Sequence, residues 1–453
     1  MKVAIIGAGW AGLAAAVQAT QAGHRTTVFE ATHAYGGRAR ALRGLKNDVK
    51  DRLLPDGSSA TLDNGQHILI GAYTDTLALM RQVGIDPAAV LLDSPMTLMF
   101  VDGLGLKFKD WPTPLDALGG ILGARGWSLA DKTSLLRAAI GWRLMGFTCA
   151  ATLSVADLCS GLSPKVNTEL IEPLCVSALN TPADRASAQV FLRVLRDALF
   201  GQQGGSRLLL PKVDLSALFP DAAAAWLQQH GGEVRLGKRV QTLHRQSDLA
   251  GATQGGRLAG SWTVNGEAFD AVILATSASS AAQALLNKSK SASESVASQM
   301  RHWAAMCHAL RSEAIATVYA WAPDARLAQP MLALRSTAQH PAQFVFDRAQ
   351  LGGPGGLLAF VVSAAEGDRA TLESQVLAQA KAQLGLTLQT VQTVVEKRAT
   401  FACTPALQRP PTHITPGLLA CGDYVDGPYP ATLEGAVRSG IAAANALNTF
   451  RVI

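Results

Sequence analysis

The N-terminal segment of the chain constrains its fold more than any other feature. Residues 2–6 form a mostly apolar run with the length of one buried parallel strand. Gly7 permits a tight turn out of that strand, and Gly9 has no Cβ, so a pyrophosphate can approach the backbone. Gly12 lets the next helix pack closely on the sheet. This order of elements predicts a dinucleotide-binding unit.

The helix that follows is alanine-rich, and Gly23 is expected to end it. Trp10 and Ala11 lie in its first turn, where backbone amides would face the phosphates. Residues 25–29 predict a second strand, and Glu30 stands at its end. A carboxylate at that point accepts hydrogen bonds from ribose hydroxyls. Because it would repel a 2′-phosphate, Glu30 argues against NADP at this site.

A second glycine turn, Gly36-Gly37-Arg38, follows Glu30 at short range. It resembles the GGR motif of the amine-oxidase and phytoene-desaturase superfamily of FAD enzymes, in which this turn approaches the pyrophosphate. Arginine suits that role because its guanidinium is a fixed, charged fork with several donors. The resemblance implies FAD as the cofactor and an α/β fold. It further implies a Rossmann-like FAD-binding domain of the GR2 amine-oxidase type and a discontinuous α+β substrate domain.

Three later segments resemble further cofactor-binding elements of this superfamily. In the superfamily, the backbone of the residue matching Val240 lies near the adenine. Gly422-Asp423 matches a C-terminal motif whose aspartate contacts the ribityl or phosphate part of FAD. A helix is expected to begin just after this motif and to point its positive end at the flavin ring. The residues at that helix start are Ala431, Thr432 and Leu433.

The cofactor domain is expected to be discontinuous and to comprise residues 1–95, 205–280 and 395–453. Residues 96–204 and 281–394 would then form the substrate domain. Apolar patterning predicts a largely helical segment over 115–200, a helix over 370–384, and strands over 269–276, 314–321, 331–334, 343–346 and 357–362. Loops or turns are expected at 251–260 and 352–356, and an exposed turn or helix surface is expected at 289–298.

Composition sets limits on partners and location. Charged residues make up only 16% of the chain and apolar residues 48%, which favours a large core, an apolar substrate channel or a membrane-facing surface. The net charge of +6 comes without any long run of Lys or Arg, so nucleic acid is not an expected partner. The six cysteines are scattered without a CxxC pair, which predicts reduced thiols in a cytoplasmic protein and no metal site. Neither a signal peptide nor a membrane-spanning helix is expected.

A closer resemblance concerns the substrate. Residues 63–73, 178–182 and 427–436 resemble hallmark segments of the squalene-associated FAD enzymes of bacterial hopanoid biosynthesis, and the match spans essentially the full chain. The resemblance implies a reductive loss of water from hydroxysqualene, with hydride delivered from N5 of reduced FAD. It therefore implies a hydrophobic C30 isoprenoid substrate and an external electron donor. It also implies that Gly65, Gln66 and His67 lie against the flavin.

The reaction needs a proton donor for the departing hydroxyl, and three residues are candidates. His67 lies in a motif expected beside the flavin, although a hydrogen bond to FAD is an alternative role. Tyr429 and Asp426 precede the flavin-facing helix and would either line the substrate side of the ring or cap that helix. Glu434 is interpreted as a carboxylate of the first helical turn rather than a catalyst.

Membrane contact is a further expectation, because a C30 isoprenoid resides in lipid. Arg137 and Arg143 stand among apolar residues of the segment 115–150, as in an interfacial amphipathic helix. The alternative for that segment is ordinary core packing. The combined prediction is a cytoplasmic protein bound peripherally to the inner face of the cytoplasmic membrane.

Three other functions remain open at this level. A carotenoid desaturase or isomerase would share the fold, and a desaturase would remove hydride from its substrate instead of donating it. A flavin amine oxidase usually has an aromatic cage and a lysine near the flavin, and the five tyrosines of this chain disfavour it. A non-catalytic FAD-dependent scaffold would hold flavin that no hydrocarbon reoxidises.

Overall fold

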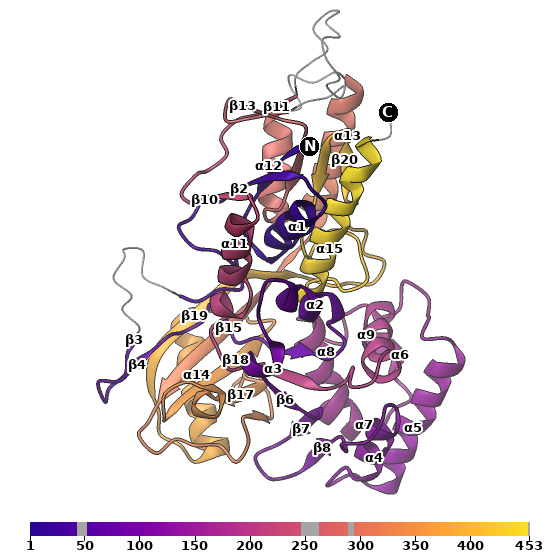
Figure 1. The fold of residues 1–453 in the computed structure, drawn as a ribbon. Coiled ribbons are helices and arrows are strands. Elements are labelled where there is room, and N and C mark those ends of the chain that lie inside the picture. Colours follow the sequence, from indigo (N-terminus) through magenta and orange to yellow (C-terminus); the bar gives the residue numbers. More distant parts are fainter. Residues whose placement is uncertain (43–51, 246–261, 289–293, 452–453) are drawn as a thin grey trace, which may run out of the picture.

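The computed structural model describes residues 1–42, 52–245, 262–288 and 294–451. Its upper part in Figure 1 contains a six-stranded sheet in the order β10-β2-β1-β14-β21-β20. All neighbours in this sheet pair in parallel except β20, which is antiparallel to β21. The strands are β1 Lys2–Ile6, β2 Arg25–Phe29, β10 Glu233–Arg235, β14 Ala271–Leu274, β20 His413–Thr415 and β21 Leu418–Ala420. This is the Rossmann-like arrangement that the sequence predicts.

Alternate residues of a strand point to opposite faces of the sheet, so each face of this sheet packs against a different hydrophobic cluster. Val3 and Ile5 belong to the hydrophobic cluster on one face, whereas Ala4 belongs to the cluster on the other. A Cβ on Gly440 would lie 2.3 Å from the carbonyl oxygen of Ala11, so glycine is needed where two covering helices cross. The helices on this face are α1 Trp10–Gln21, α11 Pro220–Gln229 and α15 Leu433–Ala446.

The opposite face is covered by α12 (Ala278–Lys288) and α13 (Glu294–Ala309). Met300 and Trp303 of α13 share a hydrophobic cluster with Ala4. Residues up to 309 therefore pack on the cofactor sheet, whereas the sequence placed 281–394 in the substrate domain. A small antiparallel sheet joins this face, with strands β11 Leu243–Arg245, β12 Trp262–Val264 and β13 Glu267–Phe269.

The strand expected over 269–276 is divided at Asp270. Strand β13 ends at Phe269, and β14 begins at Ala271. The carboxylate of Asp270 accepts a hydrogen bond from the backbone amide of Lys2 at 2.6 Å, and its own amide donates to the Lys2 carbonyl at 2.8 Å. These two bonds fix the start of β1 beside the start of β14, so the chain passes from one sheet to the other here.

A second, antiparallel sheet has the order β16-β17-β18-β15-β19. Helix α14 (Arg369–Leu384) packs on one face through Leu372 and Val376, and the other face joins the helical cluster described below. Residues 352–356 lie in the connection between β17 and β18, as the turn prediction required. The strands are β15 Ser312–Trp321, β16 Met331–Ala333, β17 Phe344–Asp347, β18 Leu357–Ser363 and β19 Gln389–Phe401, with the 3-10 helix η3 at Arg348–Leu351. The strand and helix predictions for 314–384 are thus confirmed.

The segment 115–200 is largely helical, as predicted, and lies at the lower right of Figure 1. Its helices are α4 Leu115–Leu122, α5 Leu129–Leu144, α6 Val155–Leu158, α7 Pro164–Val166, the π-helix η1 Asn167–Ile171, α8 Glu172–Leu179 and α9 Ala188–Phe200. Among the described residues, no helix combines the length and apolarity needed to span a bilayer.

Short elements link these parts. They are β3 Arg52–Leu53, β4 Ser59–Ala60, β5 Leu69–Ile70, α2 Thr74–Gln82, α3 Pro87–Val90, β6 Leu91–Ser94, β7 Thr97–Met99, β8 Gly105–Lys107, β9 Leu208–Pro211, α10 Leu215–Leu218 and the terminal 3-10 helix η4 Leu447–Arg451. The loop expected at 251–260 lies outside the described residues, as does the first half, 289–293, of the segment 289–298. The second half of that segment begins α13.

Candidate cofactor and active site

The two predicted glycine turns pack against each other. Gly9 and Gly36 form an isolated parallel bridge, and the Gly36 amide donates to the Ala8 carbonyl at 2.9 Å. A Cβ on Gly9 would meet only the Cα of Gly37 within 4 Å, at 3.9 Å, so there is open space beside the turn. A Cβ on Gly7 would lie 2.5 Å from the Ala275 carbonyl oxygen. The first glycine is thus required by packing, whereas Gly9 leaves room for a ligand.

Backbone amides at the start of α1 are free of side-chain caps. The N-cap residue is Gly9, which has no side chain that could accept a hydrogen bond from the first amides of the helix. Uncapped amides and the positive end of the helix dipole together suit a phosphate group. The turn that carries them also holds Trp10, whose indole donates to the Ala39 carbonyl at 2.9 Å, so Trp10 fixes the chain beyond the second glycine turn.

Glu30 lies beside this turn, at the end of β2. Its carboxylate accepts hydrogen bonds from the amides of Ala8, at 2.9 Å, and Thr32, at 2.8 Å. The Glu30 carbonyl accepts from the Lys238 amide at 2.8 Å, which holds the segment leading to Val240 against the same strand end. The structure therefore brings Glu30 and Val240 to the same end of the sheet, where a ribose and an adenine would follow the pyrophosphate.

Arg38 joins the first and last motifs of the chain. Its Nη2 donates to the carboxylate of Asp423 at 2.5 Å, and its Nη1 donates to the Ala399 carbonyl at 2.6 Å. The negative charge of Asp423 raises the pKa of the Arg38 guanidinium further above its ordinary value. Gly422 is tied to α15 because its amide donates to the Ser439 hydroxyl at 3.0 Å.

The start of α15 is a tight turn. Ala431 has a φ of +60°, and its amide donates to the Asp423 carbonyl at 3.1 Å. The Thr432 hydroxyl caps the helix by accepting from the Gly435 amide at 2.9 Å. Leu433 is the first helical residue. The predicted set Ala431, Thr432 and Leu433 is therefore held directly beside Asp423.

Side chains of β15 and of η3 hold the segment Gly65-Gln66-His67. The Tyr319 hydroxyl of β15 donates to the Asp63 carbonyl at 3.1 Å, and Arg348 donates to the Gln66 side-chain oxygen at 3.1 Å. The His67 Nδ1 lies 2.9 Å from the Gly65 carbonyl oxygen. A carbonyl only accepts hydrogen bonds, so Nδ1 carries the proton and neutral His67 has an unprotonated Nε2.

Burial lowers the pKa of His67, and the positive charge of Arg38 lowers it further, against the opposing effect of the Gly65 hydrogen bond. The neutral imidazole is therefore the form present near pH 7. In that form Nε2 accepts a hydrogen bond and has no proton to give. These properties suit contact with a ligand hydrogen-bond donor better than proton donation.

Tyr429 is buried, and its hydroxyl donates to the carboxylate of Asp197 at 2.7 Å. The Arg438 guanidinium lies 4.7 Å from the centre of its ring, and the Tyr73 ring lies edge-on at 6.5 Å. Burial and the bond to Asp197 raise the pKa of Tyr429, while the charge of Arg438 lowers it. Asp197, on α9, was missed by sequence reasoning, because nothing in its local sequence marks it as a partner of a tyrosine far along the chain.

Asp426 has different surroundings. Its side chain is 72% exposed and pairs with Arg409 at 3.2 Å. Arg409 also donates to the Val425 carbonyl at 2.9 Å, so Arg409 stabilises the loop that contains Val425 and Asp426. The three candidate proton donors thus do not share one cluster: His67 lies within the field of Arg38, Tyr429 contacts Asp197, and Asp426 faces solvent.

Glu434 is fully buried and links α15 to α2. Its carboxylate accepts from the Thr76 amide at 2.9 Å, the Thr76 hydroxyl at 2.6 Å, the Asp75 amide at 3.1 Å and Arg438 at 2.7 Å. It thereby satisfies amides at the start of α2, whose N-cap residue Tyr73 makes no side-chain cap. Glu434 therefore stabilises the packing of α15 against α2 by capping α2.

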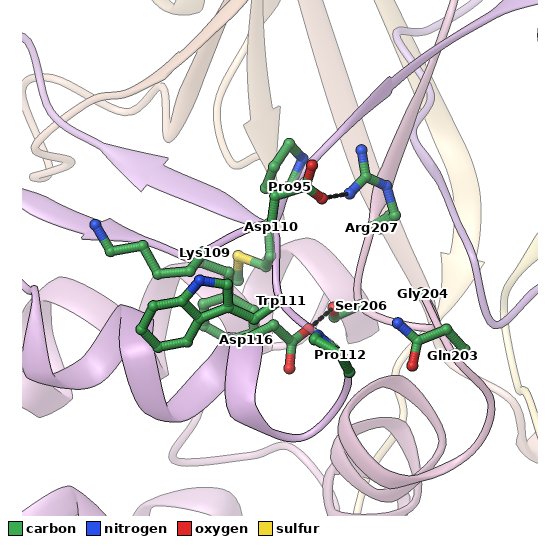
Figure 2. Close-up of a pocket in the computed structure, with 12 residues that line it drawn as sticks. Pro95, Lys109, Asp110, Trp111, Pro112, Asp116, Gln203, Gly204, Ser206 and Arg207 are labelled. Carbon is green, nitrogen blue, oxygen red and sulfur yellow. Dashed lines mark hydrogen bonds and ion pairs between the residues drawn. The ribbon is translucent and has the colours of Figure 1, made fainter.

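Two cavities lie away from the glycine turns. One, of about 260 Å³, is shown in Figure 2, where the Asp110–Arg207 ion pair and the Ser206–Asp116 hydrogen bond stand among its lining residues. The other, of about 310 Å³, lies beside Phe147 and Phe200. None of the predicted cofactor or catalytic residues lines either cavity. Across the described ranges, no group of three or more His, Cys, Asp or Glu side chains is placed to hold a metal ion.

The residues around the glycine turns fit FAD. The open space beside Gly9, the uncapped amides of α1 and the carboxylate of Glu30 match a dinucleotide. The Arg38–Asp423 pair and the start of α15 extend this cradle toward the second sheet. When bound there, FAD supplies hydride chemistry.

Comparisons with known proteins agree with this site. Residues 10–448 match the family model described as flavin containing amine oxidoreductase. A hydroxysqualene dehydroxylase of Rhodopseudomonas palustris is 28% identical over 98% of this chain and 97% of its own. Another, of Sinorhizobium fredii, is 27% identical over the same shares of the two chains.

More distant relatives share part of the chain or only the fold. A 15-cis-phytoene desaturase of Arabidopsis thaliana is 25% identical over 59% of this chain and 47% of its own. An oxidoreductase of Methanosarcina mazei superimposes with a TM-score of 0.67 at 18% identity, over 98% of this chain and all of its own. The family match extends over nearly the whole chain. The chain therefore belongs to the flavin-containing amine oxidoreductase family and is an FAD-dependent oxidoreductase.

Proposed function

We propose that this oxidoreductase removes the hydroxyl group of hydroxysqualene reductively and forms squalene. The observation that carries the proposal is full-length similarity to two hydroxysqualene dehydroxylases, which includes the segments 63–73, 178–182 and 427–436. Reduced FAD would supply the hydride from N5. The carbon–oxygen bond breaks, the hydroxyl leaves as water with one proton, and the carbon receives the hydride.

We assign the contact with the departing hydroxyl to Tyr429. Its O–H is buried and donates to the Asp197 carboxylate, so the phenol would turn from Asp197 toward the substrate to give its one proton to the departing hydroxyl. Arg438, over the ring, would stabilise the phenolate left after proton transfer. His67 is less suited to this task because its neutral form has no proton on Nε2. We assign His67 a cofactor contact, together with the predicted FAD residues.

Electrons must come from an external donor, because the product leaves the flavin oxidised. We also propose that the protein binds peripherally to the inner face of the cytoplasmic membrane, where a C30 substrate would be dissolved. The discontinuous cofactor and substrate domains remain part of this proposal, with the cofactor portion extended to residue 309 by the packing of α13.

A single anaerobic turnover tests the reaction. FAD-loaded protein is reduced chemically and mixed with hydroxysqualene while flavin absorbance and extracted lipid are followed together. Flavin reoxidation with an equal amount of squalene is the expected result. Reduced flavin that persists in the presence of hydroxysqualene would contradict the proposal.

A carotenoid desaturase is the second candidate, because the partial match to a phytoene desaturase covers more than half of the chain. It predicts the opposite direction of hydride transfer. Oxidised protein mixed anaerobically with phytoene or squalene would then become reduced, and the polyene would gain double bonds. The direction of the change in flavin absorbance, reoxidation or reduction, therefore distinguishes the two reactions.

A further inference from the structure

Exposed large apolar side chains are concentrated in one part of the described chain. All of those recorded as exposed, except Leu53 and Val101, lie between residues 111 and 145. Leu144 is 83% exposed, Leu129 77% and Ile140 60%. Figure 1 shows α4 and α5 at the outer end of the helical part, away from the two termini. Scattered apolar side chains are ordinary on a surface, but a group on two adjacent helices marks an interaction site.

Helix geometry places these residues in stripes. In α5, residues Leu129, Ile140 and Leu144 share one side because their spacing is close to whole turns of 3.6 residues. The same helix buries Leu135 and Trp142 against the protein. Helix α5 is therefore apolar both on the side that faces the core and on the side that faces solvent. Exposure of the outer apolar side to water is unfavourable unless another surface covers it. In α4, the exposed leucines 115, 118 and 122 also share a side.

Positive charge surrounds the apolar stripe of α5. Lys132 and Arg143 lie on one side of it and Arg137 on the other, at helical angles that bring all three beside the stripe. The two acidic residues of these helices are buried and occupied locally. Asp116 accepts from Ser206 at 2.8 Å, and Asp131 caps α5 through Ser128 at 2.8 Å.

We infer that α4 and α5 dock on the surface of an anionic lipid bilayer, through a docking face made of Leu115, Leu118, Leu122, Leu129, Ile140 and Leu144. Apolar side chains would enter the boundary of the acyl chains, while the flanking lysine and arginines contact the headgroups. This inference rests on the proposed function for the nature of the substrate. The contacts that carry it are independent of the chemistry at the flavin.

A cavity lies beside α4 and α5, next to the docking face. The cavity of about 310 Å³ is lined by Pro114, Arg143, Phe147 and Phe200, among others. The rings of Phe147 and Phe200 lie 5.1 Å apart, and the Arg143 guanidinium lies 5.4 Å from the Phe200 ring. Phe200 is about one helical turn beyond Asp197, the partner of Tyr429. A lipid that entered this cavity would thus meet the end of α9, about one helical turn from Asp197.

Vesicle binding tests the inference without any turnover. FAD-loaded protein is sedimented with vesicles of phosphatidylcholine, with and without phosphatidylglycerol. The wild type should bind the vesicles that contain phosphatidylglycerol more strongly, and added salt should weaken the binding. Leu144→Glu should weaken it by roughly tenfold or more, because a carboxylate replaces an inserted leucine.

Leu53→Glu is the matched control. Leu53 is 73% exposed on β3, and Figure 1 shows β3 on the other side of the molecule from α5. The control should bind vesicles like the wild type, and both variants should keep the flavin content and melting temperature of the wild type. Equal binding by Leu144→Glu and Leu53→Glu would overturn the inference, as would a wild type that binds neither vesicle.

A second copy of the chain is the competing occupant of the docking face. Sedimentation velocity distinguishes it: a dimer that Leu144→Glu dissociates and Leu53→Glu does not would overturn the lipid assignment. Failure of the dehydroxylase proposal is distinguishable, because vesicle binding would persist while hydroxysqualene left the reduced flavin unchanged. Failure of the docking inference alone would leave turnover of detergent-dispersed hydroxysqualene intact.

Discussion

The guanidinium of Arg38 lies 2.5 Å from the carboxylate of Asp423, 385 residues further along the chain. This pair joins the second glycine turn to the start of the C-terminal motif. Arg38 also donates to carbonyls at the end of β19, so it contacts the cofactor sheet and the second sheet at once. The pair therefore lies between the second glycine turn and the start of α15.

Arg38→Ala should weaken FAD retention by about tenfold or more, because it removes charge-assisted hydrogen bonds and leaves Asp423 unpaired. The flavin-to-protein absorbance ratio after dialysis measures the effect. Arg185→Ala is the control: its guanidinium is 49% exposed and pairs with Glu313 at 3.5 Å. Equal flavin retention by Arg38→Ala and Arg185→Ala would contradict a cofactor role for Arg38.

Substitutions at Gly9 and Gly12 should have different effects. A Cβ on Gly9 has only Gly37 nearby, so Gly9→Val should fold but lose FAD, since the side chain fills the ligand space. A Cβ on Gly12 would lie 2.0 Å from the Gly7 carbonyl oxygen, so Gly12→Val should disrupt the β1–α1 packing. Circular dichroism melting and flavin absorbance distinguish these outcomes. A folded Gly9→Val protein with full flavin content would show that the ligand lies elsewhere.

Tyr429→Phe should retain FAD but lower the rate of flavin reoxidation by hydroxysqualene, by about 10²–10⁴-fold if the phenol is the proton donor. Asp426→Asn should leave that rate unchanged, because Asp426 is paired with Arg409 at the surface. Stopped-flow absorbance of the reduced protein gives both rates. A wild-type rate of flavin reoxidation in Tyr429→Phe would show that another group donates the proton.

The stability contribution of His67 should depend on pH. Its pKa in the folded protein is lowered, chiefly by burial, below the ordinary value that the unfolded chain regains. The unfolded chain therefore binds the additional proton first as pH falls, and the folded state loses up to about 1.4 kcal/mol per pH unit between the two pKa values. Melting temperatures at about pH 7.5 and about pH 5.5 should differ less in His67→Gln than in the wild type. Identical pH dependence in the two proteins would exclude this contribution.

Glu434→Ala should lower the free energy of unfolding by about 1–3 kcal/mol, because it leaves the first amides of α2 without their acceptor, whereas Arg438 keeps its ion pair with Asp75 at 2.9 Å. Urea unfolding monitored by circular dichroism measures this loss. Glu294→Ala is a control, since the Glu294 side chain is 86% exposed and its pairing with Arg301 is screened by solvent. A Glu434→Ala protein as stable as Glu294→Ala would show that water replaces the lost carboxylate.

The elements that sequence patterns predicted well are those with local causes. Strands β1 and β2 have the predicted bounds because a short apolar run between turn residues permits few alternatives. The division at Asp270 was not predicted, since it depends on hydrogen bonds between Asp270 and Lys2 at the other end of the cofactor segment. Whether α13 belongs to the cofactor domain likewise depends on which sheet Met300 packs against. The spacing of apolar residues shows that a helix has a buried face, but not which element buries it.

The sequence by itself determined the glycine turn between β1 and α1, because the backbone demands at Gly7, Gly9 and Gly12 are met by residue type within one short segment. It also determined the acidic strand end at Glu30. Only the tertiary structure decided that Asp197 orients Tyr429 and that Glu434 caps α2. Such partners come from distant segments, and their meeting depends on how the sheets and helices pack, which no local pattern contains.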